Sequence, residues 1–136
     1  MHIISFANQK GGVGKTTSAV NCAACLGGLG KKTLLIDLDP QGSSTSGVGV
    51  AKNTIKYSSY DVLTKNCAPT KAIIETGFAN LSVMPSNMSL AAAELELATE
   101  DKREYFLKSA LEELEKTSSF DFMSKLLELS GENYEL

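Results

Sequence analysis

Residues 2–17 read HIISFANQKGGVGKTT and combine a strand, a glycine-rich turn and the start of a helix. His2–Ala7 is short, apolar and rich in β-branched residues, which predicts a buried strand. Thr16–Leu26 predicts a helix, and Gly11–Gly14 lies between the two elements. Glycine lets the main chain wrap closely around an anion, because no Cβ blocks the approach. We therefore predict a phosphate-binding loop between this strand and this helix.

The rest of the chain continues the alternation of strands and helices. Thr33–Asp37 and Leu81–Met84 predict two further buried strands, and residues 40–49 predict a loop. Helices are predicted at residues 59–63, 70–75, 89–98 and 102–116. Alternating strands and helices predict a parallel sheet flanked by helices, which is an α/β fold.

Length and composition narrow the class of protein. The chain has 136 residues, of which 43% are hydrophobic, with a formal net charge of −3, and this is typical of one globular domain. The net charge excludes a general attraction to nucleic acid or to an anionic membrane. The sequence has no apolar run of the ~18 residues that a membrane span needs, so we expect no membrane partner. The order of the N-terminal residues is not that of a secretory signal, so we predict a cytoplasmic protein.

The predicted loop carries the side chains that a nucleoside triphosphate requires. Its amide groups and the start of the helix form a site for anions. Lys15 is placed to reach the β- and γ-phosphates, and the hydroxyl of Thr16 is placed to coordinate Mg²⁺. The predicted phosphate-binding set is Gly11, Gly12, Val13, Gly14, Lys15, Thr16 and Thr17.

The loop resembles the deviant Walker A box of the ParA/MinD ATPases. The strict pattern GxxxxGK[ST] would need glycine where Gln9 stands, and a second lysine, Lys10, precedes Lys15 by five residues. Gln9 is typical of the ParA branch of this family. The strand–loop–helix context argues against a chance glycine-rich turn.

A second segment, LLIDLDPQG at residues 34–42, resembles the switch I segment of ParA proteins. The resemblance implies that Asp39 positions the attacking water and that Asp37 lies near the water shell of the metal. Both carboxylates lie at the C-terminal end of a predicted strand, where parallel α/β sheets bind ligands. Taken alone, the segment would fit a polar turn at the end of a strand, capped by Pro40, better than a functional segment, but the neighbouring loop favours function.

The resemblance extends over residues 1–121 and implies the N-terminal part of a P-loop domain that binds ATP and Mg²⁺. It also implies a homodimer formed through the nucleotide face, in which Lys10 reaches the partner's phosphates to promote hydrolysis. The family acts in chromosome or plasmid partitioning with a partner protein and non-specific DNA. We find no segment for either of these two partners in this sequence.

The sequence departs from the family after Phe122. A ParA protein should continue with an apolar strand that ends in the Walker B aspartate, whereas residues 123–132 read MSKLLELSGE, a helical pattern. We therefore predict a divergent helical tail at residues 122–136, with the Walker B strand and the C-terminal half missing. Strands 2–7 and 33–37 would then lack their shared neighbour, which predicts low stability or aggregation.

Three functions stay open at this stage. The chain is an ATPase, a nucleotide-binding module without turnover, or a non-functional remnant that inhibits a full-length relative. Family resemblance favours the first function, the missing Walker B aspartate favours the second, and the divergent tail motivates the third.

Overall fold

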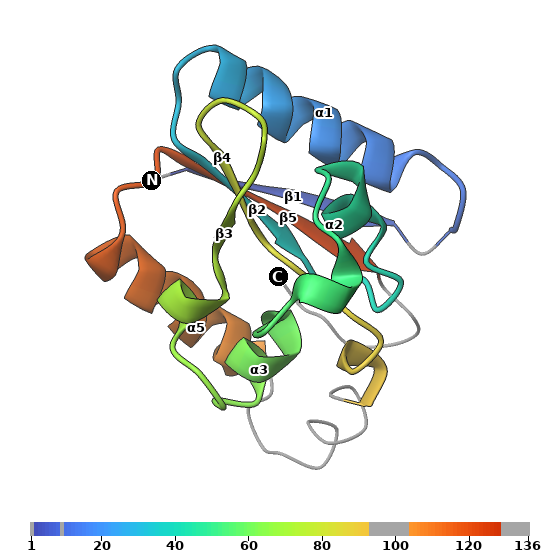
Figure 1. Cartoon of the computed structure of the whole chain (residues 1–136), viewed down its shortest axis with the longest axis vertical. Helices are drawn as coiled ribbons and strands as arrows, with labels where there is room; N and C mark the ends of the chain where they lie inside the picture. The colour runs from blue at the N-terminus through green and yellow to red at the C-terminus, as the bar shows by residue number, and fades with distance from the viewer. Residues whose placement is uncertain (1, 9, 93–103, 129–136) are drawn as a thin grey trace.

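The computed structural model describes residues 2–8, 10–92 and 104–128 (Figure 1). Its strands are β1 (His2–Asn8), β2 (Thr33–Asp37), β3 (Ile74–Glu75), β4 (Leu81–Met84) and β5 (Phe122–Glu128). Its helices are α1 (Lys15–Gly28), α2 (Ser43–Gly47), α3 (Ser59–Leu63) and α5 (Glu104–Thr117), with short 3₁₀ turns at Lys52–Thr54 and Pro69–Ala72. None of the helices in these ranges is long and apolar enough to cross a membrane.

The strands form one sheet in the order β1-β5-β2-β4-β3. The pairs β1–β5, β5–β2 and β2–β4 are parallel, while β3 runs antiparallel to β4. The predicted α/β class is thus confirmed, but the sheet is mixed. β3 is antiparallel because a short turn joins it to β4, in which Asn80 adopts a φ of 53°.

β5 corrects the predicted helical tail. Residues 122–128 are a strand that lies between β1 and β2 and pairs with both, so strands 2–7 and 33–37 share a neighbour after all. The periodicity of a short apolar run does not separate strand from helix, and two parallel strands with open edges favour a strand between them. The reason for expecting low stability therefore falls away. The division of the chain at residue 121 stays a prediction, and residues 129–136 lie outside the described ranges.

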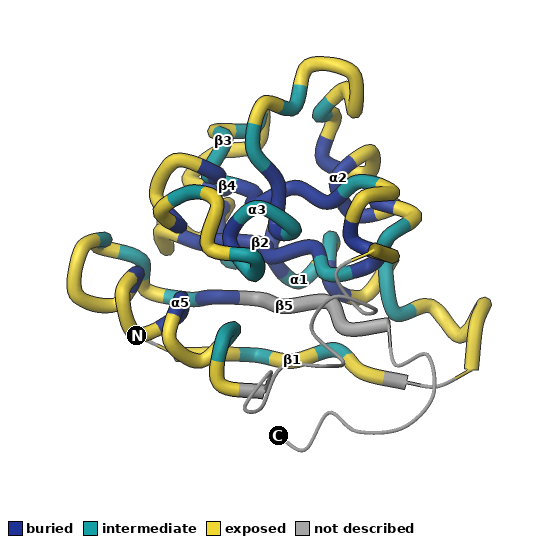
Figure 2. Tube along the Cα trace, turned by 90° about the horizontal axis from the view of Figure 1, so that it is seen from below, coloured by how far each residue is buried: buried dark blue, intermediate teal, exposed yellow. Residues whose placement is uncertain are grey.

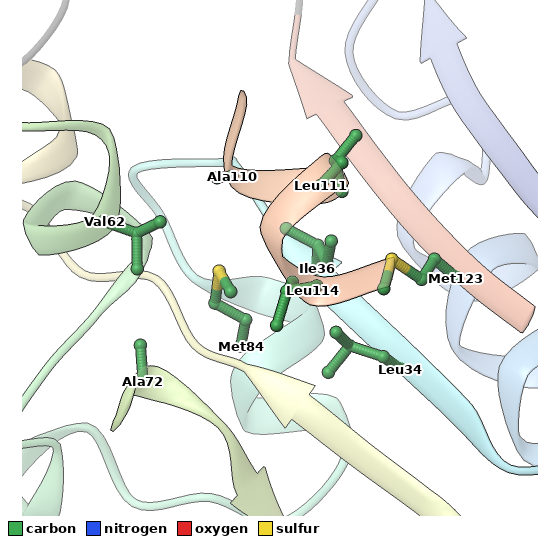
Figure 3. Packing of buried hydrophobic residues seen from close by; sticks show 9 residues of the cluster. All are labelled: Leu34, Ile36, Val62, Ala72, Met84, Ala110, Leu111, Leu114 and Met123. Carbon is green, nitrogen blue, oxygen red and sulfur yellow. The ribbon is translucent and has the colours of Figure 1, made fainter. Parts of the chain in front are cut away.

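Two helical layers cover the sheet, with α5 and α3 on one face and α1 and α2 on the other (Figure 1). Alternate residues of β2 supply both cores. Leu34 and Ile36 pack with Leu114 and Met123 under α5 (Figure 3), whereas Leu35 packs with the residues of α1. This arrangement explains why every residue of β2 is buried. β1 was predicted to be buried, and this prediction is wrong: Figure 2 shows that it is largely exposed, because it is an edge strand.

Strands 33–37 and 81–84 and helix 59–63 have their predicted bounds. Two predicted segments differ. The predicted loop 40–49 contains α2, which the left-handed residues Gly42 and Gly49 bracket, and residues 70–75 form a 3₁₀ turn and β3 instead of a helix. Of the predicted helix 89–98, residues 90–92 are helical and the remainder lies outside the described ranges.

Candidate functional site

The predicted phosphate loop joins β1 to the N-terminus of α1. Gly12 and Gly14 have φ values of 70° and 88°, which L-residues with a side chain rarely adopt. Gly14 is the N-cap of α1, no side chain caps the helix, and its first turn contains no acidic residue. The first amides of a helix have no partner within the helix, and they form the positive end of its dipole. The loop therefore offers main-chain donors to an anion.

The surroundings of the loop fit a bound phosphate chain. A Cβ added to Gly11, Gly12 or Gly14 would meet no heavy atom within 4 Å. The left-handed φ values alone favour glycine at Gly12 and Gly14, and the open space around all three glycines leaves the main chain accessible to a ligand. Residues 11–14 are all exposed, and the side chain of Val13 is 45% exposed.

The structure brings the two lysines of the loop together. The Nζ of Lys15 donates a hydrogen bond of 3.4 Å to the carbonyl of Lys10, so its side chain curls back over the loop. Lys10 is exposed and Lys15 is half-buried. Thr16, the predicted Mg²⁺ ligand, is a half-buried residue of the first turn of α1, and Thr17 follows it as an exposed residue.

Asp37 is fully buried at the end of β2. Its Oδ2 accepts hydrogen bonds from the amide of Thr45 at 2.8 Å and from the Thr45 hydroxyl at 2.7 Å. Its Oδ1 accepts a hydrogen bond from the amide of Asp39 at 3.1 Å. Three of the roughly four acceptor positions of this carboxylate are thus occupied by hydrogen bonds from the protein. Burial raises the pKa of Asp37 above its usual value, and the hydrogen bonds from Thr45 oppose that shift.

Asp39 lies in the turn that follows β2 and is 8% exposed. Its Oδ1 accepts a hydrogen bond of 2.8 Å from the amide of Gln41, and its carbonyl accepts one of 2.9 Å from the amide of Gly42. β1, β5 and β2 are parallel, so this turn and the phosphate loop both lie at the C-terminal ends of the strands. Open α/β sheets bind their ligands at this end of the strands.

Three residues that the sequence analysis did not single out support this turn. Thr45 bonds to Asp37, the amide of Ser86 donates to the Thr45 hydroxyl at 3.0 Å, and the Nζ of Lys52 donates to the carbonyl of Gln41. Thr45 stands in a run of serine and threonine that predicts a loop, so no signal in the sequence distinguishes it.

β5 contains no aspartate at its C-terminal end, where the candidate site lies. Leu126 stands in register with Asp37, and the one acidic residue of the strand is Glu128, in register with Asn8. Among the residues that the structure describes, no three His, Cys, Asp or Glu side chains gather to hold a metal. Mg²⁺ bound with a nucleotide takes many of its ligands from phosphate and water, so this finding is compatible with a Mg²⁺–nucleotide site.

The raised pKa of Asp37 predicts a dependence of stability on pH. Above about pH 3.8 the unfolded chain loses this proton first, while the folded chain retains it, so ionisation lowers the free energy of unfolding as pH rises. The loss ends once the folded-state pKa is passed. We expect the free energy of unfolding of the wild type, minus that of Asp37→Asn, to fall as the pH rises above about 3.8. Urea titrations of both proteins without nucleotide measure this difference, and a constant or rising difference would contradict the assignment.

This chain resembles known proteins in both sequence and fold. The sequence profile of an AAA domain family matches residues 1–124. The chain is 48% identical to the sporulation initiation inhibitor protein Soj of Bacillus subtilis over 110 residues, which cover 81% of this chain and 44% of Soj. It is 36% identical to the chromosome partitioning protein ParA of Caulobacter vibrioides over 123 residues, which cover 90% of this chain and 46% of ParA.

Solved structures agree with the sequence matches. A cobyrinic acid a,c-diamide synthase from Mycobacterium smegmatis with bound ADP and magnesium has a TM-score of 0.86 at 37% identity, over 92% of this chain and 50% of that chain. A plasmid partition protein from Borrelia burgdorferi has a TM-score of 0.78 at 31% identity, over 92% of this chain and 54% of that chain. The chain spans about half the length of these relatives. Since the family profile covers nearly the whole sequence and matches its strand–loop–helix start, the chain belongs to the AAA-domain family of ParA/Soj-type partitioning ATPases.

Proposed function

We propose that this chain binds ATP with Mg²⁺ on the loop between β1 and α1. The observation that carries the proposal is the pair of left-handed glycines, Gly12 and Gly14, that leads into the uncapped N-terminus of α1 beside Lys15. Structures of similar chains with ADP or an ATP analogue and magnesium support the choice of ligand.

Each residue of the loop has a proposed role. The amides from Gly11 to Thr17 hold the phosphate oxygens, with the ammonium group of Lys15 against the β- and γ-phosphates. The Thr16 hydroxyl holds Mg²⁺, with Asp37 close to its water shell. When it is bound, the metal neutralises negative charge on the phosphates.

Hydrolysis coupled to dimerisation is a further part of the proposal. Asp39 orients the attacking water, and Lys10, which is exposed, reaches the nucleotide of a second subunit. Phosphoryl transfer depends on position and charge neutralisation, so a lysine that arrives only on dimerisation would couple assembly to turnover. Similarity to the chromosome partitioning protein ParA and to a plasmid partition protein supports a role in partitioning, and we propose the cytoplasm as the place of this role.

Binding of different nucleotides tests the proposal. The loop holds the β- and γ-phosphates, so we expect Mg²⁺–ATP to bind at least about 100-fold more tightly than AMP, a difference of about 2.7 kcal/mol. Isothermal titration calorimetry on the chain, shown to be folded by circular dichroism, measures both affinities. A folded chain that ignores ATP at millimolar concentration with Mg²⁺ present would overturn the proposal.

One observation favours a second function, a binding module that holds ATP without turnover. β5 presents Leu126 in register with Asp37 and contains no aspartate. A phosphate-release assay separates the two functions. Release above that of a Lys15→Ala control supports the ATPase, whereas tight ATP binding without release supports the module.

A further inference from the structure

Thr45 lies at the centre of a buried network of hydrogen bonds. Its amide and its hydroxyl both donate to Oδ2 of Asp37, and its hydroxyl accepts the amide hydrogen of Ser86. Thr45, Asp37 and Ser86 are all fully buried. The network therefore joins β2, α2 and the residue that follows Pro85 beyond β4, three elements that are distant in the sequence.

The same network reaches Asp39 through Asp37. Oδ1 of Asp37 accepts the amide hydrogen of Asp39, and Oδ2 is occupied by Thr45. With both oxygens engaged, the carboxylate has one orientation, and the main chain at Asp39 is fixed by it. Thr45 thus acts on Asp39 without touching it.

The other end of the network is anchored at β4. The amide of Ser59, in α3, donates to the carbonyl of Pro85 at 2.8 Å, which fixes the chain next to Ser86. A Cβ added to Gly42 would lie 3.0 Å from the carbonyl oxygen of Ser86, so the turn after β2 packs directly on this segment. The network therefore has a rigid base from which Thr45 can hold the turn.

We propose that Thr45 is a positioning residue for Asp39. A hydroxyl donates to Asp37 and accepts from Ser86 at the same position, so serine can replace threonine here and valine, which has no polar group, cannot. Valine would leave a buried amide hydrogen and a carboxylate oxygen with one partner fewer. The inference rests on the proposed function only for what Asp39 does in hydrolysis, because the positioning exists without nucleotide.

Hydrogen exchange of the whole chain without nucleotide tests this role. We expect Thr45→Val to accelerate amide exchange in residues 38–46 by about tenfold or more, the effect of losing one hydrogen bond of about 1.4 kcal/mol. Amides of residues 34–36 and 81–84 should exchange at the wild-type rate, and Thr45→Ser should match the wild type throughout.

Thr76 provides the matched control. Its hydroxyl also donates and accepts, to the carbonyl of Leu81 at 2.8 Å and from the amide of Phe78 at 3.1 Å, but it lies in the turn between β3 and β4. Thr76→Val should leave exchange in residues 38–46 unchanged. If Thr45→Val does not fold, Thr45→Cys keeps the volume with a weak donor and should give a smaller, still local, acceleration.

The outcomes are distinct. Acceleration spread evenly over the chain, no acceleration in residues 38–46, or a Thr45→Ser variant that behaves like Thr45→Val would each overturn the inference. A wild type that binds no ATP would overturn the proposed function and leave the exchange result to decide the role of Thr45.

Discussion

Lys15→Ala is expected to weaken binding of Mg²⁺–ATP by about 30-fold to about 1000-fold, equivalent to about 2–4 kcal/mol. Lys15 already lies over the loop, with its Nζ 3.4 Å from the carbonyl of Lys10, so little rearrangement separates it from a phosphate bound there. Removing the ammonium group leaves phosphate oxygens without a charged partner in a partly desolvated site. Calorimetric titration with ATP in the presence of Mg²⁺ measures the loss.

Two other lysines make this experiment specific. Lys108, exposed on α5, should give the wild-type affinity as Lys108→Ala, because it lies on the helix of the opposite layer. Lys10→Ala should stay within about threefold in the monomer, since its proposed role is toward a second subunit. Equal losses for Lys10→Ala and Lys15→Ala would contradict the separate roles, and wild-type affinity for Lys15→Ala would remove the phosphate site from this loop.

The sequence predicted secondary structure best where a short apolar run is bounded by turn residues. β2 and β4 are short apolar runs between turn residues, and their bounds agree with the prediction. The prediction was wrong for β5, because the spacing of MSKLLE fits a helix as well as a strand. The strands that pair with β5 lie about 90 and 120 residues earlier in the chain. Pairing with β1 and β2 decides this segment, and local pattern does not contain that information.

The site divides in the same way. The glycines of the predicted phosphate loop adopt main-chain conformations that depend on local sequence, so the motif alone located the turn between β1 and α1. Asp37 is hydrogen-bonded to Thr45, which lies eight residues further along the chain. The burial of Asp37 and these bonds depend on how α2 packs against the sheet. Ser86 approaches Thr45 from 41 residues away. Contacts of this kind follow from tertiary structure and leave no mark in a single sequence.

Gly27 and Gly28, adjacent in α1, are expected to respond in opposite directions to alanine. Alanine normally stabilises a helix relative to glycine by up to about 1 kcal/mol. At Gly27, however, an added Cβ would lie 2.3 Å from the carbonyl oxygen of Ala79, whereas at Gly28 it would meet nothing within 4 Å. The side-chain amide of Asn80 also donates to the carbonyl of Gly27 at 3.1 Å, which holds the end of α1 against the turn between β3 and β4.

The collision at Gly27 is with main chain, which cannot rotate away as a side chain would. Gly27→Ala must therefore separate α1 from the turn at residues 79–80, and overpacking of this kind costs about 1–3 kcal/mol. We expect Gly27→Ala to lower the free energy of unfolding despite the gain in helix propensity, and Gly28→Ala to raise it by up to about 1 kcal/mol. Urea denaturation of the two variants and the wild type measures both changes. Stabilisation by both substitutions would show that the end of α1 does not pack on this turn. Lys15 and Thr16 lie at the other end of α1. Some other contact would then have to fix the position of the helix that carries these two residues.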